Sequence, residues 1–379
     1  MPKHKQKRTA RKSSLVYYIK LFAGWLGLDW PKSSIARKLL IALFVLVFVV
    51  VGIMYGTAQW YINKHKNEPV TFGATFVSSY AKSFGLDPKE TFSAIVDDLG
   101  VKKVRLVSYW SIHEPKPGKY DFSDLDWQFK KAEKENVKVS LAIGLRQPRW
   151  PECHMPEWAS GLPKDQWSAR LKDYMAKVID RYKDSPSLES YQLENEFFLS
   201  VFGICPDFSR ERLIDEYNFV KQLDSEHPVI ISRSNNAMGL PLGEPRPDSF
   251  AVSVYKRVWD KTLTKRYIEY PFPAWFYASL AGGGEILTGK NLFIHELQSE
   301  AWLPDKPEFK MNDISSIAEQ NKSLSADRLA DRIDYGVATG MKRIDLWGVE
   351  WWYWRKAKAN DPSLWETAKV KIEQHNNNN

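Results

Sequence analysis

The sequence predicts an α/β chain in which a single transmembrane helix precedes a (β/α)8 barrel, the TIM-barrel architecture. Two observations predict it: an uncharged apolar run from Leu39 to Gly56, and eight short β-type runs that alternate with helical periodicity between Thr71 and Trp354. The length of 379 residues suits a tail plus one barrel-sized domain. With 44% hydrophobic and 26% charged residues, the composition excludes a disordered or collagen-like chain.

The apolar run is long enough to cross a hydrocarbon core of about 30 Å as a helix. Trp60 and Tyr61 follow it, where aromatic side chains commonly mark the membrane interface. A cleaved signal peptide is the alternative, but the preceding segment is much longer than a signal peptide's basic region. We therefore expect four segments: a basic tail over 1–38, an anchor over 39–62, a linker over 63–70 and the barrel domain over 71–379.

The formal net charge of +8 is concentrated in the tail. The first 38 residues hold ten basic residues and one acid, which leaves 44 basic and 45 acidic residues, a charge of −1, in the remainder. A near-neutral domain lacks the broad basic face that nucleic acid needs, so no nucleic-acid partner is expected. By the positive-inside rule the amino terminus is cytoplasmic and the barrel extracytoplasmic, in a single-pass protein of the cell membrane. The stretch 15–30 is compatible with an interfacial helix or a simple linker.

The eight β runs carry the prediction of the barrel. They are followed by helical segments or long loops, for example the apolar periodicity from Trp167 to Tyr182. A doubly wound sheet is the rival, but no G-x-G-x-x-G or phosphate-binding loop follows an early run. The glycines at 282–284 are interpreted as a turn. The expected strands are 71–76, 103–108, 137–144, 187–193, 228–232, 249–254, 291–295 and 343–347.

Two glutamates stand where a barrel places its chemistry, at the carboxyl ends of strands. Glu196 follows the fourth expected strand and Glu296 follows the seventh. Two carboxylates on opposite sides of one barrel mouth are typical of glycosidic-bond cleavage, in which one protonates the leaving oxygen and the other attacks the anomeric carbon.

Several motifs in strand order resemble the clan of retaining β-glycosidases on TIM barrels that includes β-galactosidases, cellulases, mannanases and xylanases. They are Arg105 on strand 2, the stretch EPKPGKYDF from Glu114 to Phe122, Asn195-Glu196 after strand 4, Tyr255 after strand 6, Glu296 after strand 7 and Trp347-Gly348 after strand 8. The resemblance extends over roughly residues 70 to 355.

The resemblance implies a role for each motif. Glu196 would be the general acid/base and Glu296 the nucleophile of a double displacement. Asn195 would hold the sugar 2-hydroxyl, and Arg105 with Tyr255 would orient and ionise the nucleophile. Trp347 would form the floor of the site, and neither a metal nor an organic cofactor is implied.

Alternatives remain at both carboxylates. Glu194 lies two positions before Glu196 and could exchange roles with it, and Glu300 competes with Glu296 for the nucleophile. Arg105 and Tyr255 could also be structural residues. His295-Glu296 is not a zinc motif, because Ser occupies position 299 where H-E-x-x-H requires His.

Aromatic residues and cysteines complete the expected site. Trp110 and Trp150 lie beyond strand ends and could stack on sugar rings, although most such residues pack loops. Cys153 and Cys205 follow strands 3 and 4, and an oxidising compartment permits a disulfide between them. We expect a membrane-anchored β-glycosidase acting on β-linked oligo- or polysaccharides. The alternative is a catalytically silent carbohydrate-binding or cell-envelope scaffold on the same barrel.

Overall fold

The computed structural model describes residues 15–25, 33–199, 203–234 and 243–377. It divides into two compact units, 1–56 and 57–379, which are described separately. Most of the expected basic tail, including 1–14 and 26–32, lies outside the described residues. In the first unit, Ile19 and Ala23 of helix α1 (Leu15–Trp25) pack against Phe44 of helix α2.

Helix α2 (Ser34–His65) is long and apolar enough to cross a membrane, judged by length and composition. It is a candidate transmembrane span, as the sequence predicts. The helix continues to His65, so residues 63–65 of the expected linker are helical. Its last residues, from Thr57 on, belong to the second unit.

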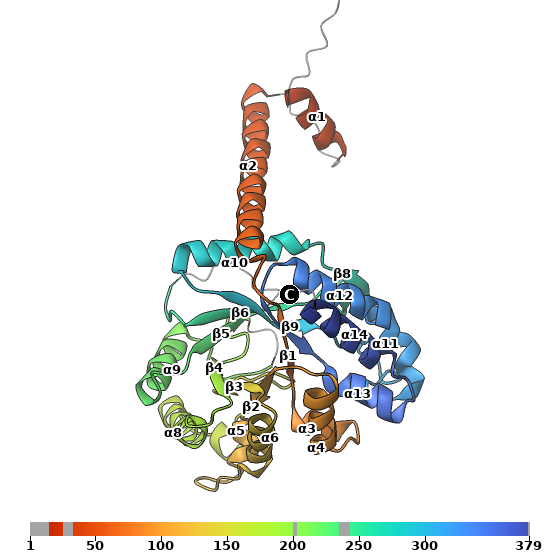
Figure 1. Cartoon of the computed structure of the whole chain (residues 1–379). Coiled ribbons are helices and arrows are strands. Elements are labelled where there is room, and N and C mark those ends of the chain that lie inside the picture. Colours follow the sequence, from red (N-terminus) through yellow and green to blue (C-terminus); the bar gives the residue numbers. More distant parts are fainter. Residues whose placement is uncertain (1–14, 26–32, 200–202, 235–242, 378–379) are drawn as a thin grey trace, which may run out of the picture. The chain divides into compact units, whose positions relative to one another are not determined.

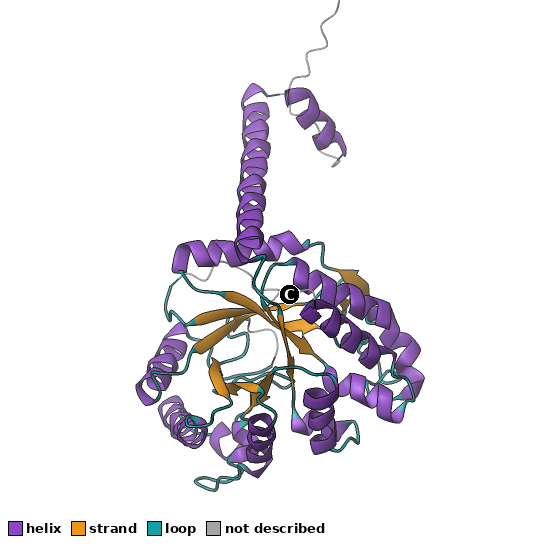
Figure 2. Ribbon diagram, in the orientation of Figure 1, coloured by secondary structure: helices purple, strands orange, loops and turns teal. Residues whose placement is uncertain are grey.

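The second unit contains a closed barrel of eight parallel strands, drawn as orange arrows in Figure 2. All eight expected strands are present, which confirms the barrel and excludes the doubly wound sheet. The closed order is β1-β10-β9-β6-β5-β4-β3-β2. The barrel strands are β1 (Thr71–Thr75), β2 (Lys103–Val107), β3 (Lys138–Ile143), β4 (Leu188–Leu193), β5 (Val229–Arg233), β6 (Ser249–Val254), β9 (Leu292–Gln298) and β10 (Arg343–Trp347).

Helices surround the barrel, as Figure 1 shows. An antiparallel hairpin that the sequence analysis did not anticipate follows β6; it is formed by β7 (Arg257–Asp260) and β8 (Arg266–Glu269). The remaining helical elements are α3 (Ser78–Ser83), α4 (Pro88–Ser93), the π-helix η1 (Ala94–Asp98), α5 (Trp110–His113), α6 (Ser123–Lys134), α7 (Glu157–Ser160), α8 (Lys164–Tyr182), α9 (Arg210–Leu223), α10 (Ala274–Thr288), the 3-10 helix η3 (Ile314–Ser316), α11 (Ile317–Ser323), α12 (Ala326–Ala338), α13 (Val349–Lys358) and α14 (Ser363–Asn377).

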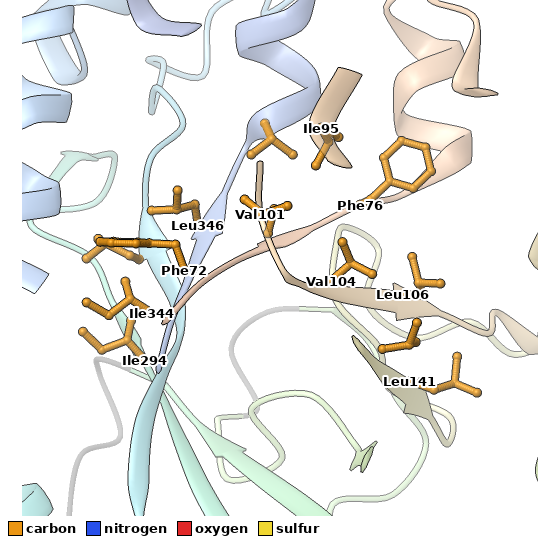
Figure 3. Packing of buried hydrophobic residues seen from close by; sticks show 14 of the residues in the cluster. Phe72, Phe76, Ile95, Val101, Val104, Leu106, Leu141, Ile294, Ile344 and Leu346 are labelled. Carbon is orange, nitrogen blue, oxygen red and sulfur yellow. The ribbon is translucent and has the colours of Figure 1, made fainter. Parts of the chain in front are cut away.

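Strand alternation separates the main hydrophobic core from the barrel interior. On β2, Val104 and Leu106 belong to the core cluster, whereas Arg105 between them bonds Thr75 of the adjacent strand β1 and Gln192 of β4, across the interior. Figure 3 shows Phe72 of β1 beside Ile344 of β10 in the same cluster. Apolar side chains therefore hold the strands to the helices, and the interior is left for polar groups.

Strand β9 contains an irregularity next to Glu296. Its register against β6 shifts between Val252, which pairs with Ile294, and Ser253, which pairs with Glu296. A bulge of this kind re-aims side chains and is common beside active sites. Because β9 continues to Gln298, Glu296 lies within the strand; the expectation that the strand ends at His295 is wrong.

The interpretation of the glycines at 282–284 as a turn is also wrong, because they lie inside α10. A Cβ on Gly282 would come within 3.0 Å of side-chain atoms of Thr57 and Tyr61, near the end of α2. The glycine therefore permits close packing between two helices. Periodicity within α10 alone could not reveal this contact with a distant segment.

Candidate active site

Glu296 is held at both carboxylate oxygens inside the barrel. Nη2 of Arg105 donates to Oε1 at 2.7 Å, and the Tyr255 hydroxyl donates to Oε2 at 3.0 Å. Arg105 is fully buried, and its Nε donates to Thr75 at 2.9 Å. Because partners from β2 and from the residue after β6 fix its two oxygens, the carboxylate has one orientation.

Glu196 follows β4 and is buried beside Glu296. Burial and the negative charge of Glu296 raise the pKa of Glu196 to about 8, although hydrogen bonds with Ser253 and Ser234 oppose the rise. Its backbone nitrogen donates to Ser232 Oγ at 2.9 Å. A carboxyl group in this setting holds its proton at neutral pH and can act as an acid.

The turn after β4 holds two glutamates in the left-handed backbone region, with φ of 56° at Glu194 and 43° at Glu196. Residues other than glycine adopt this region uncommonly, and such conformations concentrate at functional sites. The turn is fastened at Glu194, which accepts the backbone N–H groups of Leu145 and Arg146 at 2.6 and 3.0 Å. Arg212 donates to both oxygens of Glu194, so this carboxylate is fully engaged in structure. This geometry disfavours Glu194 as the acid.

A third carboxylate, Glu152, reaches the site from the loop after β3. Burial raises its pKa to about 7, with Arg146 opposing and the charge of Glu296 adding to the rise. Arg146 Nε donates to Glu152 Oε2 at 2.7 Å. Asn195 bonds Glu152 and accepts a hydrogen bond from Gln192 at 2.9 Å, so its amide is oriented by two neighbours.

Glu300, the competitor for the nucleophile, belongs to a separate charged cluster. It accepts hydrogen bonds from Tyr80 and, at 2.5 Å, from Arg149. The Arg149 guanidinium lies 3.5 Å from the Tyr80 ring centroid and 4.1 Å from that of Trp347. Arg149 also pairs with Glu350 at 3.4 Å. The Arg149 guanidinium therefore packs on the ring of Trp347 and at the same time pairs with the carboxylate of Glu300.

The carboxylates open into a cavity of about 990 Å³ at the carboxyl ends of the strands. Its described lining includes Asn195, Glu196, Tyr255, Glu296 and Trp347. Trp150, Trp259 of the β7–β8 hairpin and Trp302 also line it. The side chain of Trp150 is 75% exposed and offers a free aromatic face.

Trp110 does not reach this cavity, and its expected role in substrate binding is wrong. It is fully buried, its indole N–H donates to Glu114 at 2.7 Å, and it packs edge-on against Trp158. Trp110 begins the short helix α5, a few residues after β2 ends, and its ring also stacks on Tyr174 of α8. It is a core residue.

Cys153 and Cys205 form a disulfide, with Cα atoms 5.3 Å apart. The bond joins the loop after β3 to the loop after β4. Cys153 adjoins Glu152, and so the disulfide fastens the loop that carries the third carboxylate.

Sequence reasoning missed Glu152, Arg149, Tyr80, Gln192, Ser234 and Ser253. The position of Glu152 and Arg149 could have indicated them, because they lie in the loop after β3, on either side of Trp150 and Pro151. Ser234 and Ser253 gave no signal, since a serine at a strand end is common. Gln192 lies inside the expected strand 187–193, where the pattern does not distinguish it from its neighbours.

The described part of the chain contains no group of three or more His, Cys, Asp or Glu side chains arranged to hold a metal ion. The chemistry available from the described residues is that of carboxylates, a buried arginine and aromatic faces.

Part of this chain is similar to known proteins. The family model for glycoside hydrolase family 42, described as beta-galactosidase, matches residues 89–229, from α4 through the loop that carries Glu152 to the start of β5. Over this stretch the chain is similar to glycoside hydrolases, and its barrel has the fold of TIM-barrel glycoside hydrolases. Beta-galactosidase 14 of Arabidopsis thaliana is 23% identical over 159 residues, which are 37% of this chain and 18% of that one. Beta-galactosidase 11 of the same plant is 26% identical over 116 residues, or 26% and 14% of the two chains. The match therefore spans less than a fifth of these relatives.

Solved structures of glycosidases share the fold of this chain. A GH5_18 protein of Bifidobacterium longum subsp. infantis superimposes with a TM-score of 0.53 at 14% identity, over 80% of this chain and 79% of that one. A polyextremophilic beta-galactosidase of Halorubrum lacusprofundi gives a TM-score of 0.51 at 13% identity, over 80% and 58% of the chains. At these identities the likeness supports the barrel and not a substrate.

Proposed function

We propose that this chain is a membrane-anchored, extracytoplasmic β-glycosidase that retains anomeric configuration by a two-glutamate double displacement. The observation that carries the proposal is the pair of unlike carboxylates at one barrel mouth. Glu296 is fixed by Arg105 and Tyr255, while burial and the Glu296 charge raise the pKa of Glu196 to about 8. A carboxyl group whose raised pKa keeps it protonated is suited to act as the acid. A neighbouring carboxylate held by a cation is suited to act as the nucleophile.

In the first step, protonated Glu196 gives its proton to the glycosidic oxygen as the bond from that oxygen to the anomeric carbon breaks. Glu296 attacks the anomeric carbon, and a glycosyl ester forms while the alcohol leaves. The Arg105 cation and the Tyr255 hydroxyl orient the attacking oxygens. Loss of the Glu196 proton also becomes easier as the Glu296 charge is consumed, because the repulsion between the carboxylates disappears.

In the second step, ionised Glu196 takes a proton from water, and the water oxygen attacks the anomeric carbon. The ester bond to Glu296 breaks, which regenerates the carboxylate and releases a sugar of unchanged configuration. Asn195, oriented by Gln192 and Glu152, is placed to donate its amide N–H to the sugar 2-hydroxyl. Such hydrogen bonds strengthen in the transition state of glycoside hydrolysis.

β-Linked galactosides are the first substrate class to test, because both the matching family model and the curated relatives bear the name beta-galactosidase. The cavity of about 990 Å³ and the aromatic faces of Trp150, Trp259 and Trp302 favour a substrate with more than one sugar unit. Stacking on aromatic faces suits the apolar faces of sugar rings without demanding one linkage.

The proposed anchor spans 39–62 within α2, with the basic residues of 1–38 on the cytoplasmic side. An extracytoplasmic barrel agrees with the disulfide between Cys153 and Cys205, because disulfides persist in oxidising compartments. The catalytic domain would then act on glycans outside the cell membrane.

The test is hydrolysis by the full chain in detergent, screened on aryl β-glycosides of galactose, glucose, mannose and xylose. Glu196→Gln and Glu296→Gln should each lose activity by at least about 100-fold on the glycoside that the parent cleaves. Glu308→Gln, at an exposed position outside the site, is the matched control. Azide should rescue Glu296→Ala with formation of a glycosyl azide.

Full activity in both carboxamide variants would refute the assignment. Sugar binding without turnover across the panel would instead support a silent carbohydrate-binding scaffold.

A further inference from the structure

Helix α10 differs from the other long helices around the barrel in its composition. Within Ala274–Thr288 the single charged side chain is Glu285. Helices α8 and α12 carry acidic and basic residues throughout their length, as water-facing helices of a barrel do. The outer side of α10 is therefore unusually apolar.

The exposed part of α10 is apolar as well. Ile286 and Leu287 are adjacent and are 60% and 55% exposed. Leu280, one to two turns earlier, is half-buried. Isolated exposed apolar residues are normal, but consecutive ones on an almost uncharged helix form a patch that water solvates poorly.

The end of α2 packs against this same helix. Gly282 of α10 approaches Thr57 and Tyr61 so closely that a Cβ would come within 3.0 Å of each. One turn further on, Glu285 accepts hydrogen bonds from Lys64 and, at 2.9 Å, from His65 Nε2. Both contacts lie within the unit 57–379. The only charge of α10 is thus matched by the basic residues that end α2.

Helix geometry gives the depth of these contacts relative to the apolar run. α2 is continuous from Ser34 to His65, so Tyr61 lies one turn of about 5.4 Å beyond Thr57 and just past the end of the apolar run. Trp60 and Tyr61 are the aromatic residues expected at a membrane interface. Helix α10, which contacts Thr57 and Tyr61, therefore lies beside residues of the expected interface.

We propose that α10 is an interfacial helix, whose Ile286–Leu287 patch inserts into the outer surface of the lipid bilayer beside α2. The proposal rests on the proposed membrane anchoring and adds a second, non-spanning contact that orients the barrel. The occupant is lipid because α10 contacts Thr57 and Tyr61 at the end of the candidate transmembrane helix, and its one charge is paired. Helices of this kind bury their apolar face about 5 to 10 Å into the boundary between headgroups and acyl chains.

The test uses the full chain in phosphatidylcholine vesicles, with a single cysteine labelled by an environment-sensitive fluorophore. Native Cys153 and Cys205 are joined in the disulfide, so an added thiol is labelled selectively. Labels go at Ile286→Cys and Leu287→Cys, and quenching by nitroxide groups on the lipid acyl chains is measured. Ile314→Cys, which is 57% exposed and lies on η3 after β9, is the matched control.

The α10 labels should be quenched several-fold more than the label at Ile314→Cys, and their emission should shift to shorter wavelength on reconstitution. Equal, weak quenching at positions 286 and 314 would overturn the interfacial helix. A label at Val47→Cys, within the apolar run, separates the two proposals. Strong quenching there with none at 286 and 287 would refute this inference alone, whereas no quenching at Val47→Cys would refute the anchoring itself.

Discussion

The guanidinium of Arg105 and the carboxylate of Glu296 form a 2.7 Å ion pair inside the barrel, 191 positions apart in the sequence. Arg105 is fully buried, and its other donors bond Thr75 and Gln192. The pair couples the stability of the barrel to the orientation of the proposed nucleophile, because removal of either group leaves the other buried without its partner.

Arg105→Met should reduce hydrolysis by about 100-fold or more and destabilise the fold by roughly 3 to 5 kcal/mol, because it leaves Glu296 buried without its cation. The double variant Arg105→Met/Glu296→Gln should recover part of the lost stability, since the uncompensated charge is gone. Urea unfolding of the four species gives the coupling free energy. Strictly additive effects would show that the pair does not act as a unit.

Tyr255→Phe removes one hydrogen bond to Glu296 and leaves the ring in place. We expect kcat to fall roughly 10-fold or more, and the melting temperature to fall by a few degrees, as for a lost bond worth about 1.5 to 3 kcal/mol to a charged group. Tyr353→Phe loses a comparable hydrogen bond to Glu90, outside the site, and serves as the control. Equal activity in both variants would show that Tyr255 only packs the rim.

The pH dependence of kcat/KM should have a basic limb near pH 8, because Glu196 must be protonated to act and its pKa is raised to about 8. The same shift affects stability with a definite sign. Since the folded pKa lies above the ordinary value of 4.5, the folded state holds a proton that the unfolded state releases, and stability is lost as pH rises from about 4.5 to about 8.

Glu196→Gln should therefore melt at a higher temperature than the parent, with a difference that widens between pH 5 and pH 9. Calorimetry across that range measures the difference. A constant difference would contradict the raised pKa, and Glu308→Gln should show none at any pH.

Substitution of Trp150 should affect substrate binding, whereas substitution of Trp110 should affect stability. Trp150→Ala removes an exposed face of the cavity and should raise KM without lowering the melting temperature. Trp110→Ala empties a buried site and should cost about 3 to 5 kcal/mol of stability. The measurements are the melting temperature and KM of both variants. An unchanged KM in Trp150→Ala would show that Trp150 does not bind substrate.

Loss of the disulfide should destabilise the loop that carries Glu152. Cys153 and Cys205 are separated by 52 positions, and a cross-link of that span stabilises by roughly 4 kcal/mol in the chain-entropy account. Cys153→Ala/Cys205→Ala should melt at a lower temperature and should be insensitive to dithiothreitol, whereas the parent should lose stability on reduction. A parent that dithiothreitol leaves unchanged would contradict a stabilising role.

The sequence was sufficient for the barrel because each strand is a short apolar run and each strand end can be inspected for polar residues. It also indicated Arg105, Tyr255 and Glu296, which the structure brings into contact. It did not reveal the bulge in β9, which depends on pairing with β6. Interactions between distant loops, such as those of Glu152 and Arg149, likewise depend on tertiary contacts that no local pattern encodes.

Misassignments had the same origin. Trp110 lies just beyond a strand end, as a stacking residue would, but it is buried against Trp158 of α7. The glycines of α10 resemble a turn until the end of α2 is placed against them. In both cases a neighbour far away in sequence decides the role.

The central claim is that Glu296 attacks the anomeric carbon. The most direct test is incubation of the full chain with a 2-deoxy-2-fluoro glycoside of the sugar it hydrolyses, followed by peptide mass spectrometry. The proposed mechanism predicts one added glycosyl group, on the peptide that contains Glu296 and fragmented to that residue. A label on Glu300, or hydrolysis that inverts the anomeric configuration, would contradict it.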